Sequence, residues 1–171
     1  MTAEELLKIM PYAKLKVDVF LAPLNKAMDE FQINTPMRKA AFLGQIGHES
    51  AQLRYVRELA SGAAYEGRKD LGNICVGDGR RCVGRGLIQI TGRANYVACG
   101  KALGCDLLTY PELLETPTNA CGSAGWFWAT HKLNELADVG DFLTITKKIN
   151  GGTNGLADRA SLYDKAKEVL L

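Results

Sequence analysis

The sequence lacks several features that would assign it to a broad class of protein. No run approaches the ~20 apolar residues that a membrane-spanning helix needs. The N-terminus opens on an acidic stretch, without the basic and apolar segments of a secretory signal. A net charge of only +2, with Gly79–Arg81 as the densest basic run, does not favour nucleic acid binding. We therefore expect a protein made in a cytoplasm, with no membrane span and no nucleic acid partner.

Signatures of metal and thiol chemistry are also missing. Neither a CxxC nor an HExxH motif occurs, which predicts no zinc and no other cofactor. The five cysteines are odd in number and loosely spaced, as is typical of reduced thiols in apolar surroundings. None lies in a nucleophile motif, which argues against a thiol hydrolase. Cys75 and Cys82 flank a Gly-rich turn and could form a local disulfide after oxidation, so that pairing stays open.

Helical signals dominate what is present. The 171 residues fit one domain, residues 1–171, without linkers or repeats. Apolar residues recur at helical spacing, and prolines and glycines mark the ends of the helices. Helices are predicted from Thr2 to Pro11, around Ala13–Phe31 with a restart at Pro23, from Pro36 to about Leu53, from Thr91 to Gly104, from Pro111, from Pro117, over Phe142–Ile149 and over Leu156–Leu170. The predicted fold class is all-α, with seven to nine helices.

One long segment breaks the helical pattern. From Ala60 to Gly86 the chain is punctuated by glycines and shows no helical period. We expect a long loop region that could include a small hairpin. So long a loop in a compact domain is usually functional. The sequence therefore predicts a Gly-rich lobe beside a cleft.

Two glutamates have the surroundings that acid–base chemistry needs. Glu49 ends an apolar helical stretch, and Glu58 follows nine residues later. A carboxylic acid among apolar neighbours keeps its proton while a second carboxylate stays ionised, which is the equipment of a glycosidase. In one continuous helix the two would lie ~13 Å apart along the axis, so the helix must end near residues 51–54 and the chain must bend. The alternative is that both are solvated surface charges, as most glutamates are.

Several neighbouring motifs have both a functional and a structural interpretation. Gly84–Gly86 could approach a ligand closely or only form a turn. Gln89 and Thr91 would point the same way on an extended segment, as substrate or water ligands, but Thr91 could equally be a helix N-cap. Asn150 could bind a sugar or end a helix. Trp126–Trp128 could stack on sugar rings, although three consecutive aromatics in an all-α domain are more often core.

In this order, the motifs resemble glycoside hydrolase family 19, which includes plant and bacterial chitinases, and most closely its phage endolysin branch. The resemblance runs from about Pro36 to the C-terminus. It is carried by Ala40–Gln45, His48–Ser50, Glu58, Ala60–Arg68, Gly84–Tyr96, Trp126–Trp128 and Ile149–Gly152. It implies a single lysozyme-like helical domain with the Gly-rich lobe flanking a substrate cleft.

The resemblance also implies roles for individual residues. It makes Glu49 the general acid and Glu58 the general base, with Thr91 helping to hold the attacking water. Glu66 is kept as an alternative base. Arg159 matches a basic residue near the base glutamate. The candidate substrate-binding residues are His48, Tyr65, Arg85, Gln89, Asn95, Tyr96, Asn150 and Arg159.

Two departures from the chitinase pattern bear on the substrate. Chitinases of the family commonly carry a glutamate shortly after the Asn-Gly-Gly turn, where this chain has Thr153–Asn154. No segment between Trp128 and Asn150 is long enough to form an extra lid. Both departures favour a more open cleft.

The predicted function is therefore a peptidoglycan-degrading endolysin that cleaves the β-1,4 glycan backbone with inversion and without a metal. We expect a monomer that is released through a holin-type pore and acts on the cell wall in the periplasm. The alternatives are a chitinase, a lytic transglycosylase that forms an anhydro-sugar without water, and a non-catalytic cell-wall-binding module.

Overall fold

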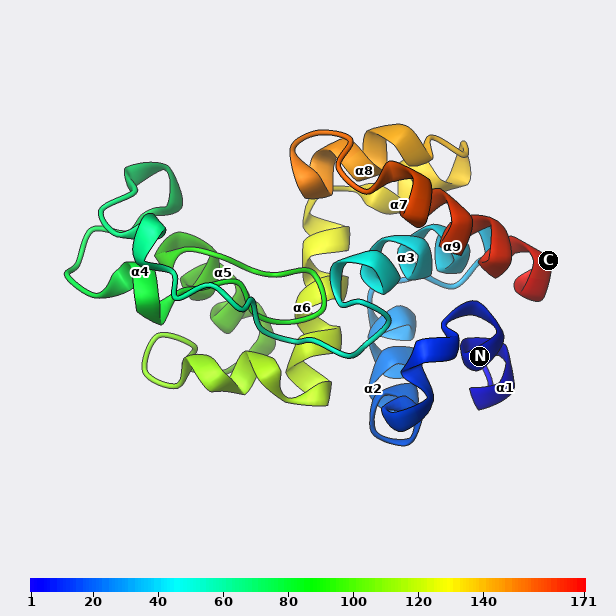
Figure 1. The fold of residues 1–171 in the computed structure, drawn as a ribbon, viewed down its shortest axis with the longest axis horizontal. Helices are drawn as coiled ribbons and strands as arrows, with labels where there is room; N and C mark the ends of the chain where they lie inside the picture. The colour runs from blue at the N-terminus through cyan, green and yellow to red at the C-terminus, as the bar shows by residue number, and fades with distance from the viewer.

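The computed structural model describes all 171 residues, and they form helices joined by turns (Figure 1). There is no strand, only isolated bridges that join Arg85 to Arg57 and to Ile90. The predicted all-α class is therefore confirmed. The helices are α1 (Ala3–Ile9), η1 (Pro11–Leu15), α2 (Val17–Glu30), α3 (Pro36–Glu49), η2 (Ala63–Tyr65), η3 (Lys69–Leu71), α4 (Asp78–Arg81), α5 (Arg93–Leu103), η4 (Pro111–Glu115), α6 (Pro117–Thr130), α7 (Leu133–Asp138), α8 (Phe142–Asn150) and α9 (Leu156–Leu170), where η marks a 3-10 helix.

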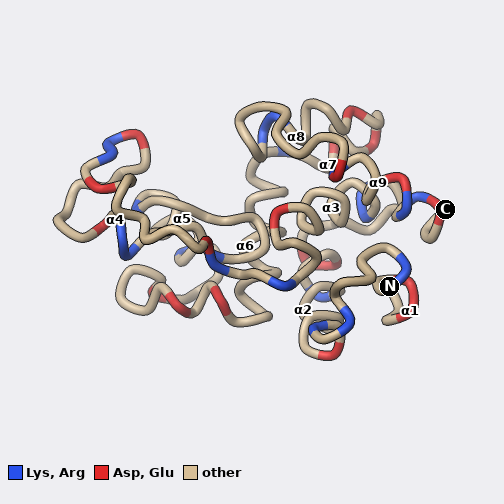
Figure 2. The backbone as a smooth tube through the Cα atoms, viewed as in Figure 1, with Lys and Arg blue, Asp and Glu red and all other residues tan.

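The molecule has a larger body and a smaller lobe (Figure 1). The body holds α1 to α3 and α7 to α9, and both termini lie at its far end. The lobe holds α4, α5 and the Gly-rich segment, and α6 lies between the two parts. Both parts carry basic and acidic residues (Figure 2). None of the helices is both long enough and apolar enough to cross a membrane.

Helix α3 is the centre of the body. Its residues 40–47 are all buried, as expected from a stretch that is apolar nearly all round. Helix α9 packs along it. Phe42 of α3 meets Trp128 of α6 edge to face, with ring centroids 5.2 Å apart. Trp128 is fully buried, and Trp126 and Phe127 pack partly buried against the same core, so the core interpretation of the aromatic triplet is confirmed.

Residues that favour helix capping lie at the starts of α1 and α3. The hydroxyl of Thr2 accepts a hydrogen bond from the backbone N–H of Glu5 at 3.1 Å, and Glu5 returns one to Thr2 at 2.7 Å. Thr35 caps α3 in a similar way, immediately before a proline at the first helical position. The predicted restart at Pro23 is wrong, because α2 already begins at Val17 and continues through the proline.

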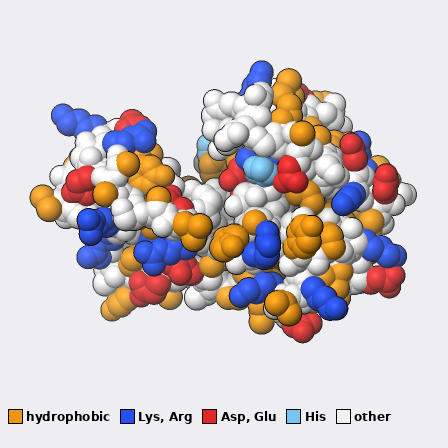
Figure 3. Space-filling model, in the orientation of Figure 1, with side chains coloured by type: hydrophobic (Ala, Val, Ile, Leu, Met, Phe, Trp, Pro, Cys, Tyr) orange, Lys and Arg blue, Asp and Glu red, His pale blue; other side chains and the backbone are white.

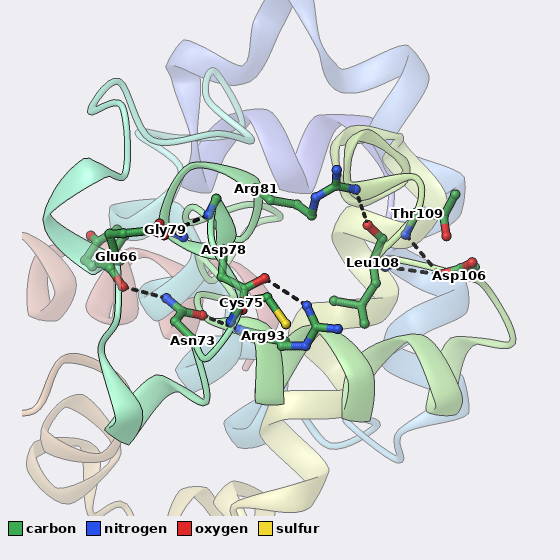
Figure 4. Close-up of polar contacts among 12 residues, drawn as sticks. Glu66, Asn73, Cys75, Asp78, Gly79, Arg81, Arg93, Asp106, Leu108 and Thr109 are labelled. Atoms are coloured by element: carbon green, nitrogen blue, oxygen red, sulfur yellow. Dashed lines mark hydrogen bonds and ion pairs between the residues drawn. The ribbon is translucent and has the colours of Figure 1, made fainter.

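Polar side chains hold the Gly-rich segment of the lobe together (Figure 4). Asn73 donates to the carbonyl of Tyr65 and accepts from the backbone N–H of Arg93, both at 2.8 Å. The carboxylate of Asp78 accepts from the Cys75 N–H and from the Arg93 guanidinium, again at 2.8 Å. Burial would raise the pKa of Asp78, but the Cys75 N–H and Arg93 hold it below the ordinary value of 3.8. In place of a hairpin the segment forms η2, η3 and α4.

All five cysteines are free thiols. Cys75 is exposed, whereas Cys82 is buried beneath the lobe surface. Cys99 and Cys121 are also buried, in helices α5 and α6. The structure therefore shows no disulfide between Cys75 and Cys82.

Candidate active site

A left-handed turn follows helix α3 and redirects the chain. Helix α3 ends at Glu49, and the backbone of Ala51–Leu53 has φ angles of 49°, 60° and 65°. Each such residue costs about 1–2 kcal/mol when it is not glycine. The Ser50 hydroxyl stabilises the turn, since it accepts from the Leu53 N–H at 2.8 Å and donates to the Ile46 carbonyl at 2.6 Å. The predicted end and bend of this helix are therefore confirmed.

Glu49 is held from inside the body by Arg159. The arginine side chain is only 1% exposed, and its Nη2 contacts Glu49 Oε1. Its Nη1 donates to Gln45 Oε1 at 2.7 Å and its Nε to the Asn154 carbonyl at 3.1 Å. Glu49 Oε2 has no hydrogen-bond partner within the protein, and the side chain is 17% exposed. One carboxylate oxygen is thus fixed while the other remains available to a ligand.

The resemblance places Arg159 near Glu58, whereas the carboxylate that Arg159 contacts is that of Glu49. Helices α3 and α9 pack side by side, so a residue early in α9 comes close to the end of α3. Glu58 follows the left-handed turn along the chain. Arg159 therefore positions Glu49.

Two further residues of this network were not predicted. Gln45 Nε2 donates to the Thr146 hydroxyl at 2.8 Å, so the fully buried Gln45 has a partner for each end of its amide. The signal for Gln45 was available, because it is the one polar side chain in an apolar run one turn before Glu49. No local pattern points to Thr146, which lies 101 residues further along the chain.

His48 is fixed beside Glu49. Its Nδ1 lies 2.7 Å from the carboxylate of Asp158 in α9. Gly155 packs against the ring so closely that a Cβ there would be 2.2 Å from His48 Cε1, and its φ of 69° also requires glycine. The imidazole is therefore locked in place, with 29% of its side chain exposed.

Glu58 is held differently, by groups of the lobe. Its Oε2 accepts from the Gly84 N–H at 2.9 Å and from the Tyr65 hydroxyl at 3.2 Å. Its Oε1 is buried and has no hydrogen-bond partner within the protein. Burial and the nearby Glu58 charge raise the pKa of Tyr65, so the phenol remains a donor at neutral pH. Glu58, like Glu49, has one oxygen held by protein donors and one without a hydrogen-bond partner in the protein.

Gly84 lies where three candidate side chains converge. A Cβ at this position would be 2.6 Å from Glu58 Oε2, 2.8 Å from Gln89 Oε1 and 3.3 Å from Thr91 Oγ1. Any side chain larger than glycine would displace these oxygens. Gly84 thus brings the backbone to the carboxylate of Glu58, and the close approach of Gly84–Gly86 to a ligand stays a prediction.

Gln89 and Thr91 meet near Glu58 for a reason other than the expected one. Gln89 has a left-handed φ of 58°, so the segment is not extended there. The Thr91 hydroxyl donates to the Gln89 carbonyl at 2.9 Å, and the N-cap residue of α5 is Gly92. The N-cap interpretation of Thr91 is therefore wrong. Both side chains keep an oxygen close to the Glu58 carboxylate.

Arg85 and Tyr96 support this segment from behind. Arg85 is 4% exposed, and it donates to the Tyr96 hydroxyl at 2.7 Å and to Glu115 at 2.8 Å. Tyr96 is fully buried and donates to the Val83 carbonyl at 2.5 Å. Burial raises the pKa of Tyr96. A substrate cannot contact these two side chains, so their predicted substrate-binding role is corrected to support of residues 83–96.

Asn95 and Asn150 are exposed, and both are tied to nearby backbone. Asn95 donates to the Thr91 carbonyl at 2.8 Å. Asn150 ends helix α8 and accepts from the Asn154 N–H at 3.2 Å. The Asn154 carbonyl in turn accepts from Arg159. Asn150 therefore has the helix-end role, and through Asn154 it also braces the group that holds Glu49.

Glu66 lacks the freedom that a base needs. Its two carboxylate oxygens accept from the N–H groups of Gly77 at 2.7 Å and of Gly79 at 2.8 Å (Figure 4). Both oxygens are thus engaged in closing the lobe. Of the two candidates for the base, only Glu58 has a carboxylate oxygen without a hydrogen-bond partner.

The surface is hollowed between the lobe and the body (Figure 3). Helix α3, which ends at Glu49, and the segment that carries Glu58 toward the lobe lie along this junction (Figure 1). Each glutamate has one oxygen held by protein donors and one without a partner. An all-helical protein with two such carboxylates has the architecture of a lysozyme-like glycosidase.

Comparisons with known proteins agree with this class. The family model described as chitinase class I, of glycoside hydrolase family 19, matches residues 32–142. A family 19 domain-containing protein of Haemophilus influenzae is 34% identical over 159 residues, which cover 74% of this chain and 77% of that protein. An endochitinase of Arabidopsis thaliana is 40% identical over 114 residues, or 66% of this chain and 38% of the plant protein. The chain thus aligns with less than half the length of this plant relative.

Solved structures share the fold. A bacterial family 19 chitinase superposes with a TM-score of 0.83 at 23% identity, covering 99% of this chain and 94% of that one. Chitinase C of Streptomyces griseus has a TM-score of 0.79 at 22% identity, covering 99% and 76%. The chain belongs to glycoside hydrolase family 19. It is a chitinase-like glycoside hydrolase.

Proposed function

We propose that this protein is an endolysin that hydrolyses the β-1,4 glycan backbone of peptidoglycan with inversion of configuration. The observation that supports the proposal is that two carboxylates are held in the same way, each through only one of its oxygens. Arg159 fixes Glu49 Oε1, and the Gly84 N–H and Tyr65 fix Glu58 Oε2. Each residue keeps a second oxygen for chemistry.

In the proposed reaction Glu49 is the general acid. Its Oε2 carries the proton and donates it to the leaving glycosidic oxygen as the bond to the anomeric carbon breaks. Arg159 keeps the carboxyl group from rotating, because its own position is fixed by Gln45 and by the Asn154 carbonyl.

Glu58 is the general base. Its Oε1 accepts a proton from a water that attacks the anomeric carbon from the opposite face, and the sugar inverts. The oxygens of Gln89 and Thr91 lie close to this carboxylate and provide further hydrogen-bond partners for that water. An inverting pair needs a separation of ~6.5–9.5 Å between the carboxyl groups to admit the water.

Two features of the region near Glu49 favour peptidoglycan over chitin as the substrate. Asn154 occupies the region where chitinases of the family commonly have a glutamate, and it offers Arg159 only its backbone carbonyl. No long segment between Trp128 and Asn150 forms a lid. A glycan with peptide branches needs such an open approach, whereas unbranched chitin does not. Chitin is the second candidate, favoured by the endochitinase named above.

The proposal includes the place of action, which is the cell wall in the periplasm after release through a holin-type pore. Expression in a Gram-negative host, with and without a periplasmic leader, tests this. Lysis only in the first case would support the proposal, and lysis without leader or pore would contradict the need for release.

The decisive test of the reaction is product analysis. Purified Gram-negative peptidoglycan is digested with the wild-type protein and with Glu49→Gln, and the released muropeptides are analysed by mass spectrometry. Chitin oligomers are treated in parallel. We expect products with a reducing N-acetylmuramic acid end from the wild type and none from the variant.

Other products would change the assignment. A reducing N-acetylglucosamine end would keep the acid–base mechanism and move the cleaved bond. Anhydro ends would replace hydrolysis with transglycosylation. Cleavage of chitin alone would identify a chitinase, and binding to the wall without any product would identify a non-catalytic module.

A further inference from the structure

Two exposed tyrosines and an arginine form a stack beside the segment that carries the catalytic candidates. The guanidinium carbon of Arg54 lies 5.3 Å from the ring centroid of Tyr12 and 5.9 Å from that of Tyr55. Both distances fall within the range of a cation–π contact. The two rings are 65% and 50% exposed. We name these three residues the tyrosine–arginine platform.

The arginine of the platform has no acidic partner. Its Nε donates to the Ala51 carbonyl at 3.0 Å, and its two terminal nitrogens bond to no protein group. Arg85 and Arg159, by contrast, each contact a carboxylate. A guanidinium presents a fork of donors that fits a carboxylate, so this one can bind an anion of a ligand.

Two residues of the platform, Arg54 and Tyr55, lie on the segment that joins the two glutamates. The Tyr12 N–H donates to Gln52 Oε1 at 2.9 Å, which ties η1 to the left-handed turn. Tyr55 lies three residues before Glu58. The strained turn that redirects the chain after α3 therefore also places Arg54 and Tyr55 against Tyr12.

The surroundings of the platform add positive charge. Lys14 and Lys16 are exposed in η1 and directly after it, and neither has a carboxylate partner. Hydrophobic and basic side chains alternate across the front of the body (Figure 3). Exposed rings interleaved with cations suit a ligand that has both apolar ring faces and negative groups.

We propose that the platform is a binding site for a glycan strand that carries carboxylates, outside the catalytic pair. The tyrosine rings stack on sugar rings, and Arg54 binds a carboxylate of the peptide or lactyl substituents. This inference rests on the proposed function, because peptidoglycan has such carboxylates and chitin has none. It explains how one face of the protein distinguishes the two polymers.

The test separates binding from cleavage. In a Glu49→Gln background, co-sedimentation with insoluble peptidoglycan and with insoluble chitin gives an apparent Kd for Arg54→Gln, Tyr12→Ala and Tyr55→Ala. Lys165→Gln removes an exposed, unpaired charge from α9, and Tyr110→Ala removes the remaining strongly exposed tyrosine, so they are the matched controls. Melting temperatures are measured to show that each variant is folded.

We expect Arg54→Gln to weaken binding to peptidoglycan about threefold at low salt, since an exposed ion pair is worth this much. Binding to chitin should not change, and the loss on peptidoglycan should shrink at high salt. Each tyrosine variant should weaken binding to both polymers by about three- to tenfold through lost apolar contact. Arg54→Glu should weaken peptidoglycan binding further than Arg54→Gln.

Equal binding of Arg54→Gln and Lys165→Gln to peptidoglycan would overturn the proposal. An equal loss on chitin would overturn the assigned ligand class. Failure of the proposed function has a different signature: the wild type would release no muropeptides while the platform variants still lost binding. If the wild type cleaves peptidoglycan and the platform variants bind like their controls, the proposed function stands and the platform does not.

Discussion

Arg159 contacts the carboxylate of Glu49 from the buried side of the body, with the arginine side chain 1% exposed and the glutamate 17% exposed. The guanidinium also binds Gln45 and the Asn154 carbonyl, so each of its three nitrogens donates to an acceptor in the protein. The catalytic candidate is therefore the outermost member of a buried polar network.

Replacing Arg159 with Gln should lower both stability and activity. Removal of one partner from a buried ion pair leaves the other uncompensated, which costs about 3 kcal/mol. For a chain of this size that is roughly 6–12 °C in melting temperature. Calorimetry measures the loss, and Lys8→Gln, which breaks the exposed pair with Glu4, should change stability by no more than ~0.5 kcal/mol. Equal melting temperatures of the two variants would show that the network contributes little to stability.

The roles of Glu58 and Glu66 can be separated by one pair of variants. Glu58→Gln should lower turnover by about 10²–10⁴-fold with little change in melting temperature, because it removes the proposed base. Glu66→Gln should keep most of the activity and lose about 1 kcal/mol of stability, since its oxygens hold the N–H groups of Gly77 and Gly79. Turnover on a soluble glycan and thermal unfolding give both numbers. The opposite pattern would make Glu66 the base.

Much of the helical framework follows from local signals. Thr35 and Pro36 fix the start of α3, and the apolar run predicts that it is central. The need to bring Glu58 back toward Glu49 predicts the bend at residues 51–54. These inferences succeed because helix periodicity and capping report directly on which residues are buried.

The parts that could not be predicted depend on contacts between distant residues. Arg159 contacts Glu49 across 110 residues of sequence, so no local pattern could show this contact. Arg85 and Tyr96 are polar enough to suggest a surface role, yet they satisfy each other in the interior. Asn73 and Asp78 order the Gly-rich segment, in which apolar residues do not recur at helical spacing.

Replacing Ala51 with glycine should stabilise the protein. Ala51 has a φ of 49°, a conformation that costs a non-glycine residue about 1–2 kcal/mol and glycine almost nothing. After the added entropy of glycine in the unfolded chain, we expect a net gain of about 0.5–1 kcal/mol. Ala98→Gly, in the exposed face of α5, is the matched control and should lose about 1 kcal/mol. Chemical denaturation measures both, and a loss of stability in Ala51→Gly would mean that the turn is not strained.

The buried thiols should make stability fall at alkaline pH. Burial raises the pKa of Cys121 and of Cys99 to about 12, and burial with the Asp78 charge raises that of Cys82 to about 11, from an ordinary 9.0. Below pH 9 the thiols are protonated in both states. Between pH 9 and 12 the unfolded chain loses these protons while the folded protein keeps them, so unfolding becomes more favourable as the pH rises.

Within that window each buried thiol lowers the free energy of unfolding by up to about 1.4 kcal/mol per pH unit. Unfolding free energies measured under reducing conditions at pH 8 and pH 10.5 should therefore differ less in Cys121→Ala than in the wild type. The variant also leaves a small cavity, but a cavity lowers stability equally at both pH values and does not alter the difference. Cys75→Ala, which replaces an exposed cysteine, is the control. Equal slopes for the wild type and Cys121→Ala would show that the Cys121 thiol ionises as readily in the folded protein as in the unfolded chain.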